Sequence, residues 1–102
     1  MIRKEHTINC ISSNYCLGLL LTPRVSCLRG QIISELAERG IGTSVYYPSP
    51  VPRMTYYQQK YPQQVKNHFQ NATHLSDSMI ALPVGPHVGE NDVAMIGNTV
   101  VD

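Results

Sequence analysis

The sequence has 102 residues, of which 42% are apolar and 15% are charged, and its formal net charge is +1. A chain of this length suits one domain with one modest core, and its apolar content argues against disorder. The near-neutral charge gives no electrostatic reason to expect binding to nucleic acid or to an acidic membrane. We therefore expect residues 1–102 to form a single domain whose partners must be inferred from particular residues.

The chain lacks the signals of membrane insertion and of an oxidising compartment. Its longest apolar run, residues 16–21, is far shorter than the roughly 20 residues of a membrane-spanning helix. No apolar stretch with a small-residue cleavage site follows the first residues. The cysteines, Cys10, Cys16 and Cys27, are odd in number and lack a Cys-x-x-Cys spacing. These observations predict a cytoplasmic protein with free thiols.

The N-terminal part of the sequence predicts a pair of strands. Residues 7–11 alternate between apolar and polar, and residues 17–22 form a nearly continuous apolar run. Between them lie Ser12, Ser13 and Asn14, whose side chains stabilise bends. We expect these two segments to form a hairpin-like pair.

An amphipathic helix is expected next. Apolar residues recur every four positions at Leu28, Ile32 and Leu36, which places them on one helix face. Ser26 is a suitable N-terminal cap, and Gly40 stands where a left-handed residue ends a helix. The pattern predicts one helix between these two residues.

Residues 43–47 are rich in β-branched and aromatic side chains and predict a strand. Pro48, Pro50 and Pro52 follow, and each lacks a backbone donor and has a fixed φ angle. We expect this segment to form a stiff, extended and exposed rail.

The remaining sequence predicts three helices and one more strand. A short helix is expected over residues 54–61, a longer one over 65–78, and a strand over 80–84. Glu90 and Asp92 place negative charge at the start of a final helix, where it is favourable. The fold class that follows is α+β, a small and mostly antiparallel sheet with helices packed on it.

The sequence contains few residues arranged like a known catalytic, metal-binding or phosphate-binding motif. Cys27 with His68 or His74 is a conceivable hydrolytic pair, although packing of Cys27 at a helix start is the simpler interpretation. The histidines have no i, i+4 spacing, and no acidic partner stands at ligand spacing, so we expect no metal. Neither a Walker-type loop nor Gly-x-Gly-x-x-Gly occurs, so no dedicated phosphate cradle is expected.

Five of the six tyrosines fall within sixteen residues, interleaved with Arg53 and Lys60. Aromatic side chains next to cations suit stacking on a base or sugar ring and pairing with phosphate. Alternatively, alternate tyrosines pack inward, in which case one of Tyr46 and Tyr47 faces the core and the other a partner. The candidate substrate-binding residues are Tyr46, Tyr47, Arg53 and Tyr56.

Two motifs give the chain a family resemblance. Residues 36–43, LAERGIGT, precede YPSP at 47–50, and SMIALPVGPH at 78–87 precedes ENDV at 90–93. In this order and separation they resemble the small-domain motifs of the DegT/DnrJ/StrS sugar aminotransferases. The resemblance covers nearly the whole chain. Many members have histidine at the positions of Tyr46 and Pro52, where this sequence departs.

The resemblance implies a small domain like the C-terminal one of fold-type I aminotransferases, which closes beside the active-site cleft. Such enzymes use pyridoxal phosphate to move an amino group onto a nucleotide-linked keto sugar, and their large domain holds the cofactor. Lys4, Lys60 and Lys66 match no Schiff-base motif. We therefore expect the large cofactor-binding domain to be absent and no cofactor to bind to this chain alone, and we assign it no catalytic residue.

Three functional hypotheses follow. In the first, the chain is an isolated small domain, a fragment or a truncated reading frame, that is inactive alone; a separate large-domain chain is then a candidate partner. In the second, it is a free-standing binding or assembly module that self-associates through an exposed apolar face. The third is an unrelated small hydrolase that uses Cys27.

Overall fold

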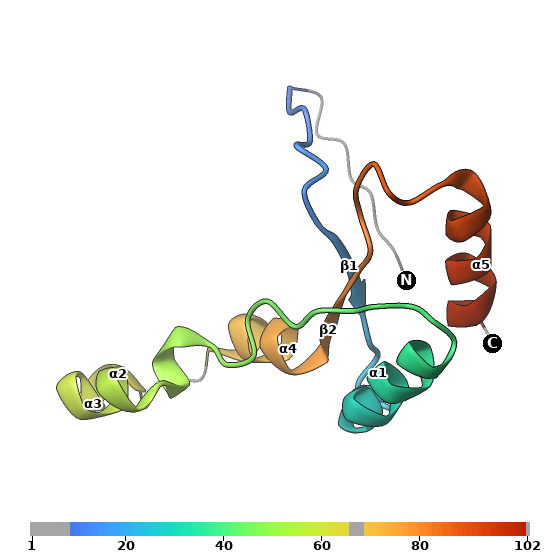
Figure 1. Ribbon diagram of the computed structural model, residues 1–102. Coiled ribbons are helices and arrows are strands. Elements are labelled where there is room, and N and C mark those ends of the chain that lie inside the picture. Colours follow the sequence, from blue (N-terminus) through green and yellow to red (C-terminus); the bar gives the residue numbers. More distant parts are fainter. Residues whose placement is uncertain (1–8, 66–68, 102) are drawn as a thin grey trace.

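The computed structural model describes residues 9–65 and 69–101 and has an α+β architecture (Figure 1). The predicted class, a small antiparallel sheet with helices packed on it, is confirmed. In the described part of the chain the regular elements are β1 (Leu17–Leu20), η1 (Ser26–Leu28), α1 (Arg29–Glu38), η2 (Val51–Arg53), α2 (Thr55–Lys60), α3 (Pro62–Val65), α4 (Gln70–Ser78), β2 (Met79–Leu82) and α5 (Glu90–Val101).

β2 is the centre of the sheet. It pairs antiparallel with β1, in a register that sets Leu17 opposite Leu82 and Leu20 opposite Met79. On its other edge, Ala81 exchanges two backbone hydrogen bonds with Ser44, at 2.8 and 3.0 Å. A strand whose side chains are buried on both faces is expected to be apolar throughout, and β2, with sequence MIAL and buried residues on both faces, meets this expectation.

The core lies against this sheet. Leu19 and Leu21 come from β1 and the residue after it, and Ile80 and Leu82 come from β2; all four are buried. The half-buried apolar residues packed against them come from β1 and from helices α1 and α5: Leu17, Ile32, Ile33, Ile96 and Val100. One layer of helices thus covers the sheet, as the apolar stripes of the two helices predict.

The predicted hairpin between residues 7–11 and 17–22 is wrong. Residues 7 and 8 lie outside the described part of the chain, and residues 9–11 are not in a strand. Cys10 and Ile11 are both exposed, so neither contributes a buried side chain to a strand. β1 pairs instead with the apolar β2, because that partner lets both strands bury their side chains.

The strand and rail expected after α1 are also shorter than predicted. The strand of residues 43–47 reduces to the single bridge between Ser44 and Ala81. Pro50 is buried and extended, but Val51–Arg53 forms the turn of 3₁₀ helix η2. The fixed φ angle of proline fits the first positions of a 3₁₀ helix as well as an extended chain. The prolines therefore did not keep the whole segment extended.

The other helical predictions hold with adjusted bounds. The helix expected between Ser26 and Gly40 comprises η1 and α1, but the Ser26 hydroxyl donates to the Pro23 carbonyl and does not cap α1. Gly40 ends α1 with φ +80°, a conformation that favours glycine. α2, β2 and α5 match their predictions, whereas the helix expected over 65–78 is α4, preceded by α3.

The molecule is more open than a compact domain of its size. Residues 51–65, which comprise η2, α2 and α3 and which we call the arm, project away from the sheet (Figure 1). The radius of gyration is 16.1 Å, against about 13 Å for a compact chain of this length. The accessible surface is 8179 Å², against about 5,800 Å² for a compact protein of this mass. None of the helices in the described residues is long and apolar enough to cross a membrane.

Ile80 offers a direct test of the core. Its side chain is completely buried between the sheet and the helices, so Ile80→Ala should lower the free energy of unfolding by about 2–5 kcal/mol. Ile11→Ala is the matched control, because Ile11 is fully exposed, and should change it by less than about 0.5 kcal/mol. Chemical denaturation measures both; equal effects would contradict this core.

Candidate functional site

The two sequence motifs meet at one hollow of about 420 Å³. Residues 40–44 and Tyr46 line one side of it, and residues 81–84 with His87 and Val88 line another. Helix α5 closes it with Asp92, Met95 and Ile96. The Ser44–Ala81 bridge brings these segments together, because it fastens the chain after α1 to the edge of β2.

His87 has a defined place in this hollow. It lies within the turn in which the Val88 amide donates to the Gly85 carbonyl at 3.1 Å. A Cβ atom on Gly85 would lie 2.8 Å from both Cε1 and Nδ1 of His87. The imidazole therefore packs directly over the Gly85 backbone, and a side chain at that position would displace it.

The polar groups that line the hollow are mostly uncharged. Asp92 is the acidic residue among them, and its Oδ2 accepts a 2.8 Å hydrogen bond from the Gly89 amide at the start of α5. Among residues 9–65 and 69–101, none that lines the hollow is a lysine or arginine. Tyr46, His87 and Thr43 offer hydrogen-bonding groups beside apolar carbon, an arrangement suited to a hydroxylated ring and unsuited to a phosphate.

Tyr46 and Tyr47 both face outward. Their exposed fractions are 51% and 61%, so the expectation that one of them packs into the core is wrong. Tyr46 lines the hollow, whereas Tyr47 lies outside its lining. Tyr47 raises the pKa of the Tyr15 phenol, chiefly through side-chain hydrogen bonding.

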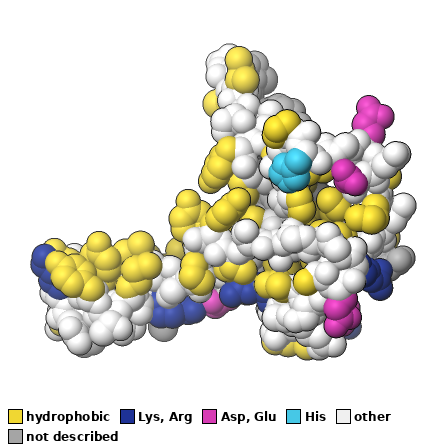
Figure 2. Space-filling model, viewed as in Figure 1, with side chains coloured by type: hydrophobic (Ala, Val, Ile, Leu, Met, Phe, Trp, Pro, Cys, Tyr) yellow, Lys and Arg dark blue, Asp and Glu magenta, His cyan; other side chains and the backbone are white. Residues whose placement is uncertain are grey.

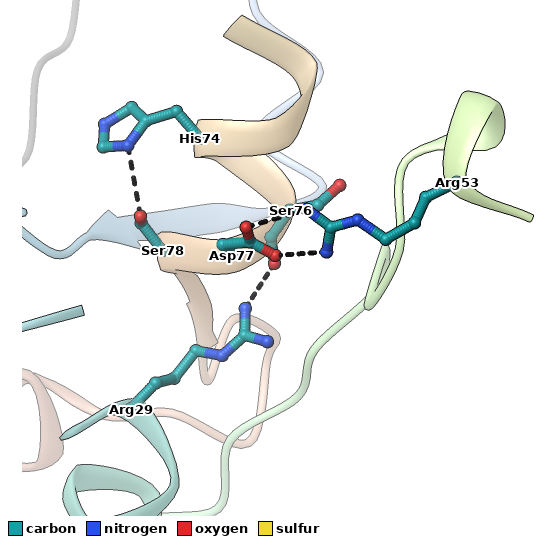
Figure 3. A network of polar contacts seen from close by, with 6 residues as sticks. All are labelled: Arg29, Arg53, His74, Ser76, Asp77 and Ser78. Carbon is teal, nitrogen blue, oxygen red and sulfur yellow. Dashed lines mark hydrogen bonds and ion pairs between the residues drawn. The ribbon is translucent and has the colours of Figure 1, made fainter. Parts of the chain in front are cut away.

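Arg53 is engaged within the chain. Its guanidinium donates two hydrogen bonds to the carboxylate of Asp77, at 2.8 and 3.0 Å (Figure 3). Arg29, at the start of α1, donates to the carbonyl of the adjacent Ser76. Two cations thus meet the C-terminal end of α4, where a helix dipole favours positive charge. The arm is thereby fastened to α4, and α4 to α1.

The charges of this pair depend on each other. The Arg53 guanidinium holds the pKa of the Asp77 carboxyl below its usual range, chiefly through its hydrogen bonds. The same bonds raise the pKa of Arg53. Both side chains are almost half exposed, so water and salt screen the pair. We therefore expect the pair to position the arm against α4 and to contribute little to the free energy of unfolding.

Tyr56 lies on the arm, among other aromatic residues. Its hydroxyl accepts a 2.8 Å hydrogen bond from Lys60 Nζ, which also lies over the rings of Tyr56 and Tyr61. The ring of Tyr57 meets that of Tyr56 edge to face at 5.0 Å. The four candidate residues therefore divide into Tyr46 and Tyr47 near the hollow, Arg53 at the base of the arm, and Tyr56 on the arm.

The described residues do not fit pyridoxal phosphate. Lys60 is the one lysine among them, and its amino group is held by tyrosines on the arm, away from the residues that line the hollow. Lys4 and Lys66 lie outside the described part of the chain. We therefore derive no step through this cofactor.

The proposed hydrolytic pair gains no support from geometry. Cys27 is exposed on η1. His74 lies with its Nδ1 3.2 Å from the hydroxyl of the buried Ser78, one turn along α4 (Figure 3). This contact satisfies a buried hydroxyl and accounts for His74 structurally. His68 lies outside the described residues.

His87 and Asp77 are the residues that sequence reasoning missed. His87 stands inside the second motif, and its place directly after Gly85-Pro86 was the available signal. Asp77 carries no comparable signal, because its partner Arg53 lies 24 positions away in sequence.

Comparison with known proteins identifies relatives of the whole chain. Residues 2–101 match the model of the DegT/DnrJ/EryC1/StrS aminotransferase family. A search of curated proteins finds no match. The fold matches that of Helicobacter pylori PseC, described as an aminotransferase involved in the biosynthesis of pseudoaminic acid, with a TM-score of 0.75 at 24% identity. The match covers 88% of this chain and 23% of PseC.

The Arg53–Asp77 pair predicts a pH-dependent attachment of the arm. Because folding lowers the pKa of Asp77, the contribution of the pair is present above the ordinary aspartate pKa of about 4 and is lost as the pH falls through the lowered value. Carboxyl-detected NMR should show Asp77 titrating at a higher pH in Arg53→Gln than in the wild type. Identical titrations would show that the two side chains do not interact in solution.

Proposed function

Because the chain belongs to the DegT/DnrJ/EryC1/StrS aminotransferase family, we propose that it is the small-domain part of a nucleotide-sugar aminotransferase and that its hollow contacts the sugar of the substrate. The chain spans about a quarter of the length of the matched aminotransferase. Complete enzymes of the family depend on pyridoxal phosphate. In this proposal the cofactor and its lysine belong to a large domain outside the sequence.

The observation that carries the proposal is the meeting of the two motifs at one hollow. Motif residues 40–43 and 81–84, separated by almost forty positions, line it together, and Tyr46 and His87 add hydrogen-bonding groups. Motifs that serve only the fold have no need to expose polar side chains at a shared cavity. Their convergence therefore favours recognition of a ligand.

The charges of the lining refine the proposal. The described part of the lining carries Asp92 and no lysine or arginine, which disfavours a diphosphate inside the hollow. We assign the hollow to the sugar, with Tyr46 and His87 as hydrogen-bonding partners of its hydroxyl or acylamino groups. Tyr47 and the arm residues Arg53 and Tyr56 would shape the approach to it.

The chain alone should not transfer amino groups. Addition of pyridoxal phosphate should give no stoichiometric absorbance band of lysine-bound cofactor, because Lys60 is held among tyrosines on the arm. Titration in an absorbance spectrometer, with Lys60→Gln as the control, measures this. A stoichiometric band in the wild type that disappears in the control would contradict the proposal.

Sugar recognition is tested with UDP-N-acetylglucosamine and UDP as probes. The nucleotide sugar should shift the amide resonances of residues 42–46 and 84–88, whereas UDP alone should not. Tyr46→Ala and His87→Ala should each weaken binding about 10-fold, the loss expected for one or two hydrogen bonds. Tyr61→Phe, on the arm, is the control and should bind normally. Equal shifts with UDP, or shifts confined to other residues, would refute the assignment.

A further inference from the structure

The segment that carries Tyr46 and Tyr47 is held only weakly by its own backbone. Both side chains are more than half exposed, and Pro50 is the buried residue of the segment. Within the described part of the chain, the backbone hydrogen bonds outside helices and strands join no residue from 45 to 50 to a distant segment; the one that Pro50 accepts comes from the nearby Arg53 amide. The position of residues 45–50, which we call the tyrosine loop, therefore depends largely on how its two ends are fastened.

Both ends of the tyrosine loop are fastened to one continuous stretch of the chain. Directly before the loop, Ser44 exchanges backbone hydrogen bonds with Ala81 of β2. Shortly after the loop, Arg53 donates to both carboxylate oxygens of Asp77 in the last turn of α4. Since α4 passes directly into β2, the loop is closed at both ends on this junction, which we call the α4–β2 junction.

The α4–β2 junction is itself held in place by other contacts. Arg29, from α1, donates to the carbonyl of Ser76 (Figure 3). The buried hydroxyl of Ser78 lies 3.2 Å from Nδ1 of His74. The residues on either side of Asp77 are thus fixed without the help of the arm, and Asp77 is a firm point of attachment for it.

The form of the ion pair suits positioning. A guanidinium and a carboxylate that share two parallel hydrogen bonds fix each other's orientation, which the single ammonium of lysine does not do. Figure 2 shows basic and acidic side chains together where the arm joins the body, and hydrophobic side chains farther along the arm. Because Nη1 and Nη2 of Arg53 both donate to Asp77, this guanidinium is less available to a phosphate group of a ligand.

We propose that Arg53 and Asp77 are positioning residues for the hollow: by closing the tyrosine loop on the α4–β2 junction, they hold Tyr46 where it lines the hollow. The identity of the ligand in this proposal rests on the proposed function. A segment that is tethered at one end samples many conformations, and ordering it when a ligand binds costs conformational entropy. The ion pair orders the loop beforehand, so its loss should affect affinity more than the free energy of unfolding.

The order of the loop can be measured without a ligand. Arg53→Gln and Asp77→Asn should each lower the NMR order parameters of the Tyr46 and Tyr47 amides from about 0.85 to below about 0.6. Arg24→Gln is the matched control, because it makes the same chemical change at an exposed arginine before η1, and it should leave both order parameters unchanged. Far-UV circular dichroism verifies that each variant is folded. Order parameters that stay at the wild-type values in Arg53→Gln and Asp77→Asn would overturn the proposal.

The effect on recognition is measured with UDP-N-acetylglucosamine. Each single variant should raise the dissociation constant about 5-fold, and the double variant should raise it no further, because either change alone opens the same contact. Direct binding of the ligand by Arg53 predicts a different result, since Asp77→Asn would release the guanidinium and leave the affinity unchanged or higher. An Asp77→Asn variant that binds as well as the wild type, or losses that add in the double variant, would overturn the proposal.

The two measurements separate this proposal from the proposed function. A wild type that does not bind the nucleotide sugar would refute the proposed function, and the order parameters of the free chain would still decide whether the pair positions the loop. Binding by the wild type together with equally tight binding by the variants would refute the positioning and leave the proposed function intact.

Discussion

The antiparallel pairing of β1 with β2 is the constraint on which the rest of the structure depends. It joins segments about sixty residues apart, with Leu17 opposite Leu82, and it provides the floor on which α1 and α5 bury their apolar residues. β2 then offers its second edge to Ser44. Since both motifs border β2, the pairing that builds the core also places Tyr46 and His87 at one hollow.

The sequence predicted the elements whose signals are local. The four-residue spacing of apolar side chains in α1, the acidic first turn of α5 and the apolar run of β2 each arise from the element itself. Strand pairing was predicted wrongly because residues 7–11 are close to β1 in sequence but alternate too weakly to bury a face. The distant β2 is apolar on both faces and is the better partner.

The candidate site was also predictable only in part, because some of its residues carry a local sequence signal and others meet only through the fold. Tyr46 stands in a motif and was named from the sequence, whereas its neighbour His87 was not, because only the fold reveals that the two motifs share a hollow. Arg53 was assigned to a substrate from its place among tyrosines. The structure pairs it with Asp77, a contact between distant residues that neither spacing nor composition indicates.

The openness of the molecule is consistent with the small-domain role proposed for it. In the proposed function, a small domain that packs beside a large one keeps surfaces that its own core does not cover, here the arm. The hollow has the same origin in the proposed function, since a sugar-binding wall needs an opposing wall that lies outside these residues. The proposed recognition of a sugar thus depends on the framework of β1, β2 and the Ser44 bridge.

Native-state amide hydrogen exchange of Ser44 and Ala81 tests this framework most directly. Each amide donates to the carbonyl of the other residue, so the account predicts that both are protected and that they open together with the amides of β1. Free exchange at Ser44 with protection retained at Ala81 and in β1 would contradict it, because the first motif would then be detached from the sheet and the two motifs would not share a site.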